Sequence, residues 1–449
     1  MSDETVDVVV IGAGLAGLRA AEILVEAGKR VAVVEARDRV GGRSRTEDWE
    51  GATIDLGGQW IGPGQHRLEA LAARLGVETF PTRVAGDRVV DLDGALTREK
   101  TDGRFPSLAQ VAESLGKRYV DGLAEKVPAH NPEAAPDALR LDGAALAQWR
   151  DRVLPVDSVR RLFDVSVKTV FGAEAHSLSV LYFLWYLQTG GGYGAHVDVK
   201  GGAQERRFVT GAQSLSTRLA DALGDRVRLG HAVRSVREQE GRVRVTTDAG
   251  SFDAARVICA TPPNLTARIE WSPALPAHRA RSMARMPMGA TVKFLARYAR
   301  PFWRERGLSG EAVSGRGPIS YCVDNSAHDD STAMILGFVV GDDAVRWTAS
   351  SPARREGEAL AQLARWFGEE ALRPVAVRSH DWAEDPWTGG CPVCNPAPGV
   401  LTAEGARLRD PHGRVHFAGT ETATAWVGYF EGALESAERA AEEVLSAGA

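Results

Sequence analysis

The chain has 449 residues, a formal net charge of -5 and 44% hydrophobic residues. This length exceeds one ordinary hydrophobic core, so we expect two domains or one large interleaved body. The acidic balance argues against a nucleic-acid-binding domain, which is usually basic. The four cysteines are too few for a secreted disulfide framework.

No targeting or membrane segment is predicted. Residues 2–5 are polar and acidic, whereas a signal peptide starts with a basic region before an apolar one. No run approaches the roughly 20 apolar residues that span a bilayer. We therefore expect a cytoplasmic protein with no membrane and no nucleic-acid partner. Its oligomeric state is open, with a homodimer as one alternative.

The chain begins with the pattern of a strand, a glycine-rich turn, a helix and a second strand. Residues 6–11 are rich in β-branched side chains, which is typical of a strand buried on both faces. Residues 18–27 predict a helix that ends at Gly28, and residues 30–35 predict another buried strand. Together they predict a βαβ unit.

The turn of this unit matches G-x-G-x-x-G through Gly12, Gly14 and Gly17. The first glycine permits a tight turn, the second lets the backbone approach a pyrophosphate, and the third lets helix and strand pack closely. Ala16 lies where free N–H groups at the helix start favour phosphate. Glu35 ends the second strand, placed to accept hydrogen bonds from ribose hydroxyls and to disfavour NADP. These features predict a dinucleotide site.

Later segments extend the pattern to the end of the chain. Short alternating runs predict strands at residues 227–229, 233–236, 243–245 and 256–260. Residues 415–419 predict a strand that enters a turn, and residues 428–445 predict a helix.

Less regular stretches, richer in Trp and Pro, separate these units. We infer a discontinuous nucleotide-binding domain made of residues 1–80, 208–286 and 385–449. The intervening residues 81–207 and 287–384 form a substrate-binding domain of the α+β type. The predicted fold class is therefore α/β, with a Rossmann-like domain interleaved with the second domain.

The residues that follow Glu35 favour FAD over NAD. The run continues through Ala36 and Arg37 to Gly41, Gly42 and Arg43. Arginines and paired glycines just beyond the ribose acid can place a second layer of donors around the pyrophosphate. An ordinary NAD domain does not need this run.

The same run, residues 35–43, resembles the signature that follows the first βαβ unit in the FAD-dependent amine oxidases. Residues 55–62, 201–206 and 417–433 are similar to further motifs of that family, in the same order. The resemblance covers nearly the whole chain and is greatest to the monoamine oxidase branch, of the soluble bacterial type. It implies that an amine is oxidised to an imine, which yields an aldehyde and ammonia, while dioxygen becomes hydrogen peroxide.

The resemblance implies a set of flavin contacts. The final strand and turn lie against the isoalloxazine ring and ribityl chain in the family, and a tryptophan stacks near the flavin. Matching positions, together with a strand residue at the adenine, are Gly58, Gln59, Trp60, Val233, Trp382, Gly419, Thr420, Glu421 and Gly428.

Two residues match catalytic positions of the family. Lys293 matches a lysine that holds a water against flavin N5, where a cation favours charge on the reduced flavin. Tyr429 matches one wall of an aromatic cage in front of the flavin, and is expected to contact it. The opposite wall is usually aromatic, but Pro392 stands here, so we expect a one-sided cage and a weaker arylalkylamine preference.

Cys391 matches the cysteine that forms a thioether with the flavin in membrane-bound relatives. Covalent FAD at Cys391, metal or dithiol chemistry with Cys394, and inert cysteines all stay open. No clustered ligand spacing predicts a metal site.

Four further residues are expected in the substrate cavity with Pro392. Gln204 and Tyr321 match cavity positions of the monoamine oxidases, and Phe171 and Val197 are candidates for apolar lining. Buried core is the alternative for each.

Three rival functions stay open. An L-amino acid oxidase needs a cation for the substrate carboxylate, and none is clearly placed in residues 62–67. A diamine or polyamine (putrescine-type) oxidase needs an acid deep in the cavity, for which Asp324 and Glu174 are candidates. A flavoprotein interaction subunit, of the chromatin-associated kind, carries a long helical insertion that this sequence lacks.

Overall fold

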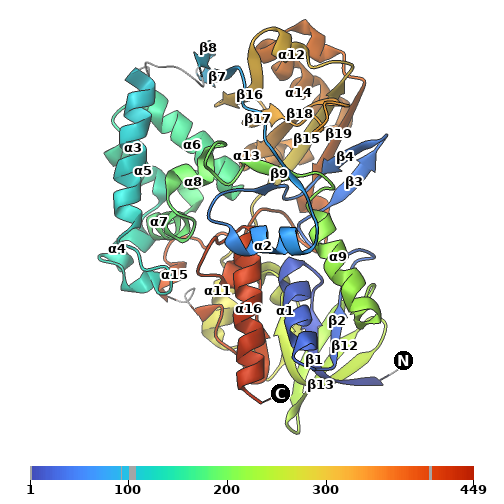
Figure 1. The fold of residues 1–449 in the computed structure, drawn as a ribbon. Helices are drawn as coiled ribbons and strands as arrows, with labels where there is room; N and C mark the ends of the chain where they lie inside the picture. Colours follow the sequence, from blue (N-terminus) through green and yellow to red (C-terminus); the bar gives the residue numbers. More distant parts are fainter. Residues whose placement is uncertain (1–2, 93, 101–107, 404–406, 449) are drawn as a thin grey trace.

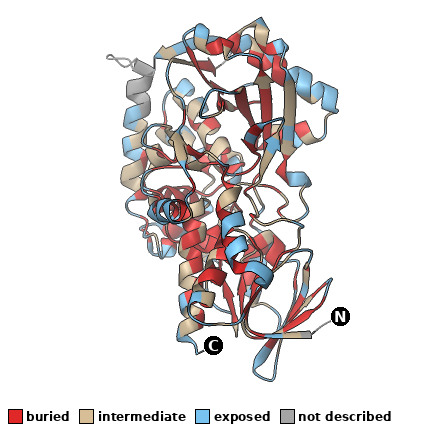
Figure 2. Ribbon diagram, turned by 45° about the vertical axis from the view of Figure 1, so that its right-hand side comes forward, coloured by how far each residue is buried: buried red, intermediate tan, exposed pale blue. Residues whose placement is uncertain are grey.

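The computed structural model describes residues 3–92, 94–100, 108–403 and 407–448. Two large sheets lie at opposite ends of the molecule, at the bottom and the top of Figure 1, and a group of helices flanks them on the left. Buried residues concentrate in the strands of both sheets and in the helix faces beside them (Figure 2). The α/β prediction is confirmed.

The lower sheet has eight strands in the order β10-β2-β1-β13-β12-β11-β14, with β20 also paired to β13. Its strands are β1 (Asp3–Ile11), β2 (Val31–Val34), β10 (Val227–Arg228), β11 (Val233–Gln239), β12 (Arg242–Thr247), β13 (Ser251–Cys259), β14 (Glu270–Ser272) and β20 (Val415–Phe417). Strands β10, β2, β1, β13 and β20 pair in parallel. Their carboxyl ends therefore meet at one edge, where open α/β sheets bind ligands.

Both faces of β1 are covered, as its run of apolar residues predicts. Val8 and Val10 pack in one core with helices α1 (Leu15–Glu26), α9 (Gln213–Leu223) and α16 (Phe430–Ser446), while Val9 faces a second core. Helix α1 begins three residues before its predicted start, because Gly14 takes the N-cap position. Helix α16 lies beside α1 although the two are at opposite ends of the sequence (Figure 1).

The upper sheet has seven strands in the order β19-β15-β18-β17-β16-β7-β8. They are β7 (Asp87–Leu92), β8 (Ala95–Lys100), β15 (Thr291–Tyr298), β16 (Leu308–Ser314), β17 (Tyr321–Asp324), β18 (Ala333–Val340) and β19 (Ala376–Asp381). Strand β15 runs antiparallel between β18 and β19, which places Lys293 opposite Phe338 on one side and His380 on the other.

Two small sheets complete the fold. Strand β3 (Thr46–Trp49) pairs with β4 (Ala52–Asp55), and β9 (Arg206–Phe208) lies between β5 (Trp60–Ile61) and β6 (Thr79–Pro81). The pairing of Ile61 with Arg206 joins two of the family-like segments that are far apart in sequence.

The remaining helices surround the sheets. They are α2 (His66–Arg74), α3 (Leu108–Ala124), α4 (Ala138–Gly143), α5 (Leu146–Val153), α6 (Asp157–Phe171), α7 (Val180–Thr189), α8 (Tyr193–Val197), α10 (Pro263–Thr266), α11 (Ala277–Ala284), α12 (Phe302–Glu305), α13 (Asp342–Thr348), α14 (Pro352–Phe367) and α15 (Val400–Ala403). Helix α7 is buried almost throughout and is the centre of the left-hand group.

The strands of the lower sheet all come from residues 1–80, 208–286 and 385–449, and those of the upper sheet from residues 81–207 and 287–384. The β5-β9-β6 sheet crosses these boundaries. The division into two domains at these positions stays a prediction.

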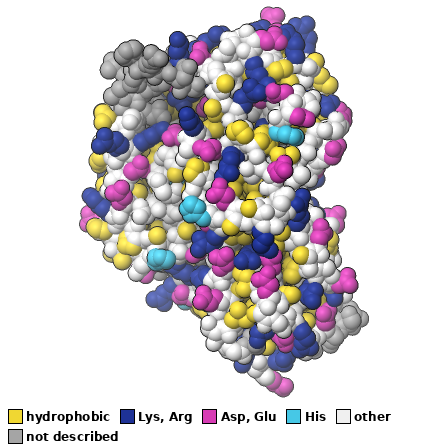
Figure 3. All heavy atoms as spheres, in the orientation of Figure 1, with side chains coloured by type: hydrophobic (Ala, Val, Ile, Leu, Met, Phe, Trp, Pro, Cys, Tyr) yellow, Lys and Arg dark blue, Asp and Glu magenta, His cyan; other side chains and the backbone are white. Residues whose placement is uncertain are grey.

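Within the described ranges, every helix is too short or too polar to cross a membrane. On the face shown in Figure 3, basic and acidic side chains are interspersed, with a recess on the right between the upper and lower parts.

Candidate active site

One cavity of about 560 Å³ extends from the glycine turn of the lower sheet to the strands of the upper sheet. Its walls contain residues from α1, β15, β17 and the turn before α16. The expected cofactor, catalytic and substrate residues line this cavity except for Gly17, Glu421 and Phe171.

The glycine turn has the geometry that a pyrophosphate requires. Gly12 has a φ of +99°, and a Cβ on Gly17 would lie 1.9 Å from the Gly12 carbonyl oxygen. Gly17 therefore lies outside the cavity wall because it packs the helix against the turn. The N-cap Gly14 provides no side-chain hydrogen bond, and the first turn of α1 contains no acidic residue. The N–H groups at this helix end can therefore bind an anion.

The carboxylate of Glu35 is fixed at the end of β2. Its Oε2 accepts a hydrogen bond from the backbone N–H of Ala13 at 2.8 Å, and its Oε1 accepts one from the N–H of Arg37 at 3.0 Å. The residue is buried but lines the cavity. Oε1 also accepts a longer hydrogen bond from Arg37 Nη1 at 3.4 Å, so Oε2 is the oxygen that keeps a lone pair for a ribose hydroxyl.

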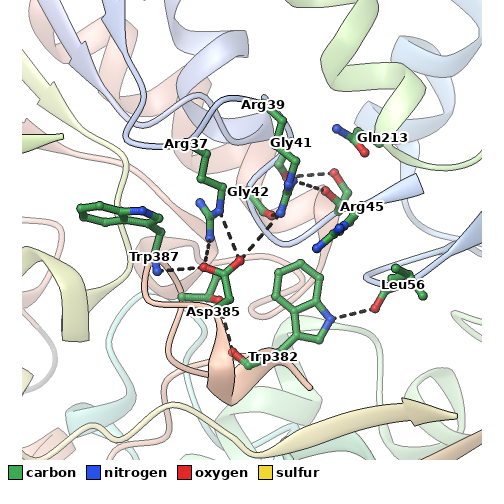
Figure 4. Close-up of polar contacts among 12 residues, drawn as sticks. Arg37, Arg39, Gly41, Gly42, Arg45, Leu56, Gln213, Trp382, Asp385 and Trp387 are labelled. Carbon is green, nitrogen blue, oxygen red and sulfur yellow. Dashed lines mark hydrogen bonds and ion pairs between the residues drawn. The ribbon is translucent and has the colours of Figure 1, made fainter. Parts of the chain in front are cut away.

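The arginines after Glu35 have partners within the protein (Figure 4). Arg37 donates to both carboxylate oxygens of Asp385, at 2.9 and 3.3 Å. Arg39 donates to the carbonyl oxygens of Val40, Gly42 and Ser44, and burial lowers its pKa to about 10. These side chains therefore brace the loop from within the protein.

Arg43 also has a buried partner. It donates to the two carboxylate oxygens of Glu421 at 2.6 and 3.0 Å, and to the Pro392 carbonyl oxygen at 2.7 Å. Glu421, expected as a flavin contact, is absent from the lining of this cavity, and its Oε1 also accepts from the Cys394 N–H at 3.3 Å. The charge of Glu421 keeps the pKa of Arg43 above its usual value, against the effect of burial.

Lys293 is buried, with 3% of its surface exposed, and lines the cavity. Its Nζ donates to the Asp55 carbonyl oxygen at 2.9 Å and to Gln59 Oε1 at 2.5 Å. Burial lowers the pKa of Lys293 to about 7, although the Asp55 carboxylate favours the charged form. The Lys293 ammonium also lies 5.4 Å from the Trp60 ring centroid. The site therefore contains a cation that can lose its proton near neutral pH.

A buried amide network fixes the lysine. Gln59 Nε2 donates to Asn325 Oδ1 at 2.9 Å, which also accepts from Arg207 Nη1 at 2.7 Å. The ammonium of Lys293 and the guanidinium of Arg207 can only donate hydrogen bonds, so each faces an amide oxygen. Gln59 Oε1 must therefore point at Lys293.

Tyr429 precedes α16 and is surrounded by rings. Its ring centroid lies 6.2 Å from that of Tyr186, 5.3 Å from His196 and 5.1 Å from Trp426, at interplanar angles of 46°, 45° and 78°. None of these three rings is parallel to it. Pro392 lines the same cavity, and the one-sided cage stays a prediction.

Phe171 lies behind the cavity wall, with its ring centroid 4.5 Å from that of Tyr186. Helix α6 turns it into the aromatic core of the left-hand helices, which explains its 1% exposure. The cavity residues that sequence reasoning missed include Tyr186, His196 and Phe338. Only Phe338 had a usable signal in the sequence, because it belongs to an apolar run. That run forms the strand opposite Lys293.

Cys391 lines the cavity, whereas Cys394 is buried beside it. Burial raises the pKa of the Cys391 thiol to about 12, although Arg43 and Lys293 act in the opposite direction. In the part of the chain that the structure describes, no three His, Cys, Asp or Glu side chains are grouped to hold a metal ion.

Comparison with known proteins identifies relatives along the whole chain. A family model described as flavin containing amine oxidoreductase matches residues 15–445. The chain is 37% identical to the probable flavin-containing monoamine oxidase A of Dictyostelium discoideum, over 98% of this chain and 97% of that protein. It is 35% identical to the flavin-containing amine oxidase B of Homo sapiens, over 98% of this chain and 86% of that protein.

Solved structures agree with this relationship. The structure of a cyclohexylamine oxidase from Brevibacterium oxydans IH-35A matches with a TM-score of 0.94 and 37% identity, over 98% of this chain and 99% of that chain. A wild-type putrescine oxidase bound to putrescine matches with a TM-score of 0.95 and 33% identity, over 99% and 100%. The chain therefore belongs to the flavin-containing amine oxidoreductases, enzymes that oxidise amines with FAD as the cofactor.

Proposed function

We propose that this enzyme oxidises a neutral monoamine at a site formed by Lys293 and Tyr429, with dioxygen as the final acceptor and hydrogen peroxide as the product. The observation that carries this proposal is that both side chains line one cavity with the glycine turn. Bound FAD supplies the two-electron acceptor for the amine α-C–H bond.

The cavity fits FAD along its length. The uncapped start of α1 offers N–H groups to the pyrophosphate, and Glu35 offers carboxylate oxygens to the ribose. The backbone at Gly419 and Gly428 also lines the cavity, and both residues have a positive φ. We propose that these groups hold FAD, with Val233 at the adenine end and Trp382 near the ring.

The substrate end of the cavity favours an uncharged amine. The apolar and aromatic wall includes Val197, Tyr321 and Phe338, and an ammonium against these side chains would lose its hydration. Lys293 is already a cation in this cavity, and its repulsion makes the binding of a protonated amine less favourable still. We propose that Tyr429 orients the neutral amine through its ring face and that Lys293 positions a water.

A diamine is the second candidate substrate. The two acids considered from sequence do not line the cavity, because Asp324 is bound by Trp303 and Arg304, and Glu174 accepts from the Asp342 N–H. However, Glu311 and Asp198 do line it, and the solved putrescine oxidase is similar along the whole chain.

A comparison of substrates tests both candidates. Peroxide release should be measured with cyclic and aryl monoamines, with an aliphatic monoamine and with a diamine of matched length. The monoamine proposal predicts a higher kcat/KM for the monoamine of each matched pair. A higher value for the diamine, lost in Glu311→Gln, would replace it with the second candidate. No peroxide with any amine would contradict the proposal.

A further inference from the structure

His196 lies directly behind Tyr429. It belongs to α8, is 1% exposed, and contributes to the cavity wall. Its Nδ1 is 2.8 Å from the hydroxyl oxygen of Tyr429. No motif in the sequence indicated this residue, and the reaction as described above does not use it.

The imidazole of His196 is fixed in place. A Cβ added at Gly190 would lie 2.4 Å from Cε1 and 2.5 Å from Nε2 of His196. The ring therefore fills the space that any side chain at position 190 would need. Rings of Tyr186 and Trp426 lie on its other sides, with centroids at 5.0 and 5.6 Å. Such packing leaves the ring no room to rotate.

The groups around His196 bear on which nitrogen carries the proton. The backbone carbonyls of Leu187 and Tyr186 approach the imidazole and favour its protonated form, although Nε2 has no partner within normal hydrogen-bond geometry among the described residues. The Tyr429 hydroxyl beside Nδ1 can donate or accept, so that contact fits either tautomer. With the proton on Nε2, the lone pair of Nδ1 accepts the hydroxyl proton of Tyr429.

A second tyrosine lies beside Tyr429. The ring centroid of Tyr186 is 6.2 Å from that of Tyr429, and burial, followed by the nearby Tyr429, raises the pKa of Tyr186 well above its usual value. With Nδ1 of His196 as the acceptor, the single proton of Tyr429 is committed to His196, so only an oxygen lone pair remains for the cavity.

We propose that His196 is a positioning residue that keeps the Tyr429 hydroxyl from donating a hydrogen bond to the substrate nitrogen. This inference rests on the proposed function, in which Tyr429 faces the amine. The nitrogen lone pair supplies electron density as the α-C–H bond breaks, and a hydrogen bond donated to that lone pair would withdraw it. His196 thus leaves the lone pair free.

Anaerobic flavin reduction by an amine tests the proposal. In His196→Leu the Tyr429 hydroxyl is released toward the substrate, so reduction should slow by about 2- to 10-fold, the range of one hydrogen bond, without weaker amine binding. His196→Asn, whose amide oxygen can replace Nδ1, should keep the wild-type rate. In a Tyr429→Phe background, His196→Leu should have no further effect.

Two kinetic results would overturn the proposal. One is a slow reduction in His196→Leu that persists when Tyr429 is already Phe, because it would show a packing defect. The other is equal slowing in His196→Asn and His196→Leu. His416→Asn is the matched control, because His416 is a buried histidine bonded to Glu443 at 2.9 Å outside the cavity. It should lower thermal stability and leave the reduction rate unchanged.

A measurement independent of activity separates this inference from the proposed function. In protein with ¹⁵N-labelled histidine, the signals absent from His196→Asn belong to His196. At pH 7 they should show a neutral ring protonated at Nε2, and protonation at Nδ1 would overturn the inference. If no amine reduces the flavin although this tautomer is present, the proposed function fails while the hydrogen bond to Tyr429 stands.

Discussion

Arg43, which is partly buried, and the buried Glu421 form a doubly hydrogen-bonded ion pair although 378 positions separate them in the sequence. The pair connects the loop after β2 to the turn before α16. Because Arg43 also binds the Pro392 carbonyl oxygen, one guanidinium joins three segments of the cavity wall.

Arg43→Leu should therefore destabilise the protein. It leaves the carboxylate of Glu421 buried without its partner, which costs about 3–5 kcal/mol. Denaturant unfolding of the FAD-loaded protein measures the change. The control is Arg354→Ala, since the Arg354–Glu358 pair is exposed and should contribute less than about 0.5 kcal/mol. Equal effects of the two substitutions would show that the buried pair has no special role.

Lys293→Met should slow the reaction of the reduced enzyme with dioxygen by on the order of 10²–10³-fold, because it removes one preorganised charge. Anaerobic reduction by the amine should change much less. Lys168→Met is a suitable control, since Lys168 is also buried, pairs with Asp343 and lies outside the cavity wall. Similar, small effects on both half-reactions would leave Lys293 a structural role only.

The reaction with dioxygen should also depend on pH. Lys293 has a pKa lowered to about 7, so it is charged below that pH and loses its charge above it. The wild-type rate should fall as the pH rises through about 7, and Lys293→Met should show a flat profile. Stopped-flow reoxidation between pH 6 and pH 9 tests this dependence, and an unchanged inflection in the variant would assign it to another group.

Tyr429→Ala should lower kcat/KM for amines by roughly 1–3 kcal/mol in transition-state free energy if the ring orients the substrate. Tyr429→Phe keeps the ring and should be milder. Pro392→Tyr supplies a ring at the position that is aromatic in the monoamine oxidases, so kcat/KM should shift towards arylalkylamines. An unchanged aryl preference in Pro392→Tyr would contradict a one-sided cage.

FAD should be bound without a covalent link. The pKa of Cys391 is raised to about 12, so the thiol is protonated at neutral pH, whereas the thiolate is the nucleophile. The purified protein should be yellow, and acid precipitation should leave FAD in the supernatant. Flavin that stays with the pellet in the wild type, but not in Cys391→Ala, would establish a thioether.

Local patterns account for the cofactor end of the cavity wall more than for the contacts at the substrate end. The glycine turn, Glu35 and the final turn depend on short motifs whose backbone geometry is set locally. The hydrogen bonds of Lys293 to Gln59, and of His196 to Tyr429, join segments more than 200 residues apart. The spacing of residues in the sequence does not indicate such contacts, because only tertiary packing creates them.

Phe171 shows the same limit of local sequence patterns, for a residue that was expected in the cavity wall. Its apolar character is compatible with a cavity wall and with a core, and only the rotation of α6 against α7 decides between them. The arginines after Glu35, expected as donors near the pyrophosphate, also donate to Asp385 and to nearby carbonyl oxygens. Asp385 is 348 positions from Arg37, beyond any local pattern.

The order in which the chain is synthesised determines when Arg43 and Glu421 can pair. The glycine turn leaves the ribosome early, but Glu421, Tyr429 and α16 follow only after most of the chain. At ~5–20 residues per second, the 378 positions between Arg43 and Glu421 take roughly 20–75 s to translate. During that interval the nascent lower sheet lacks β20 and the helix that covers it. Tight retention of the cofactor therefore has to wait until residues 415–446, which contain β20 and α16, have been made.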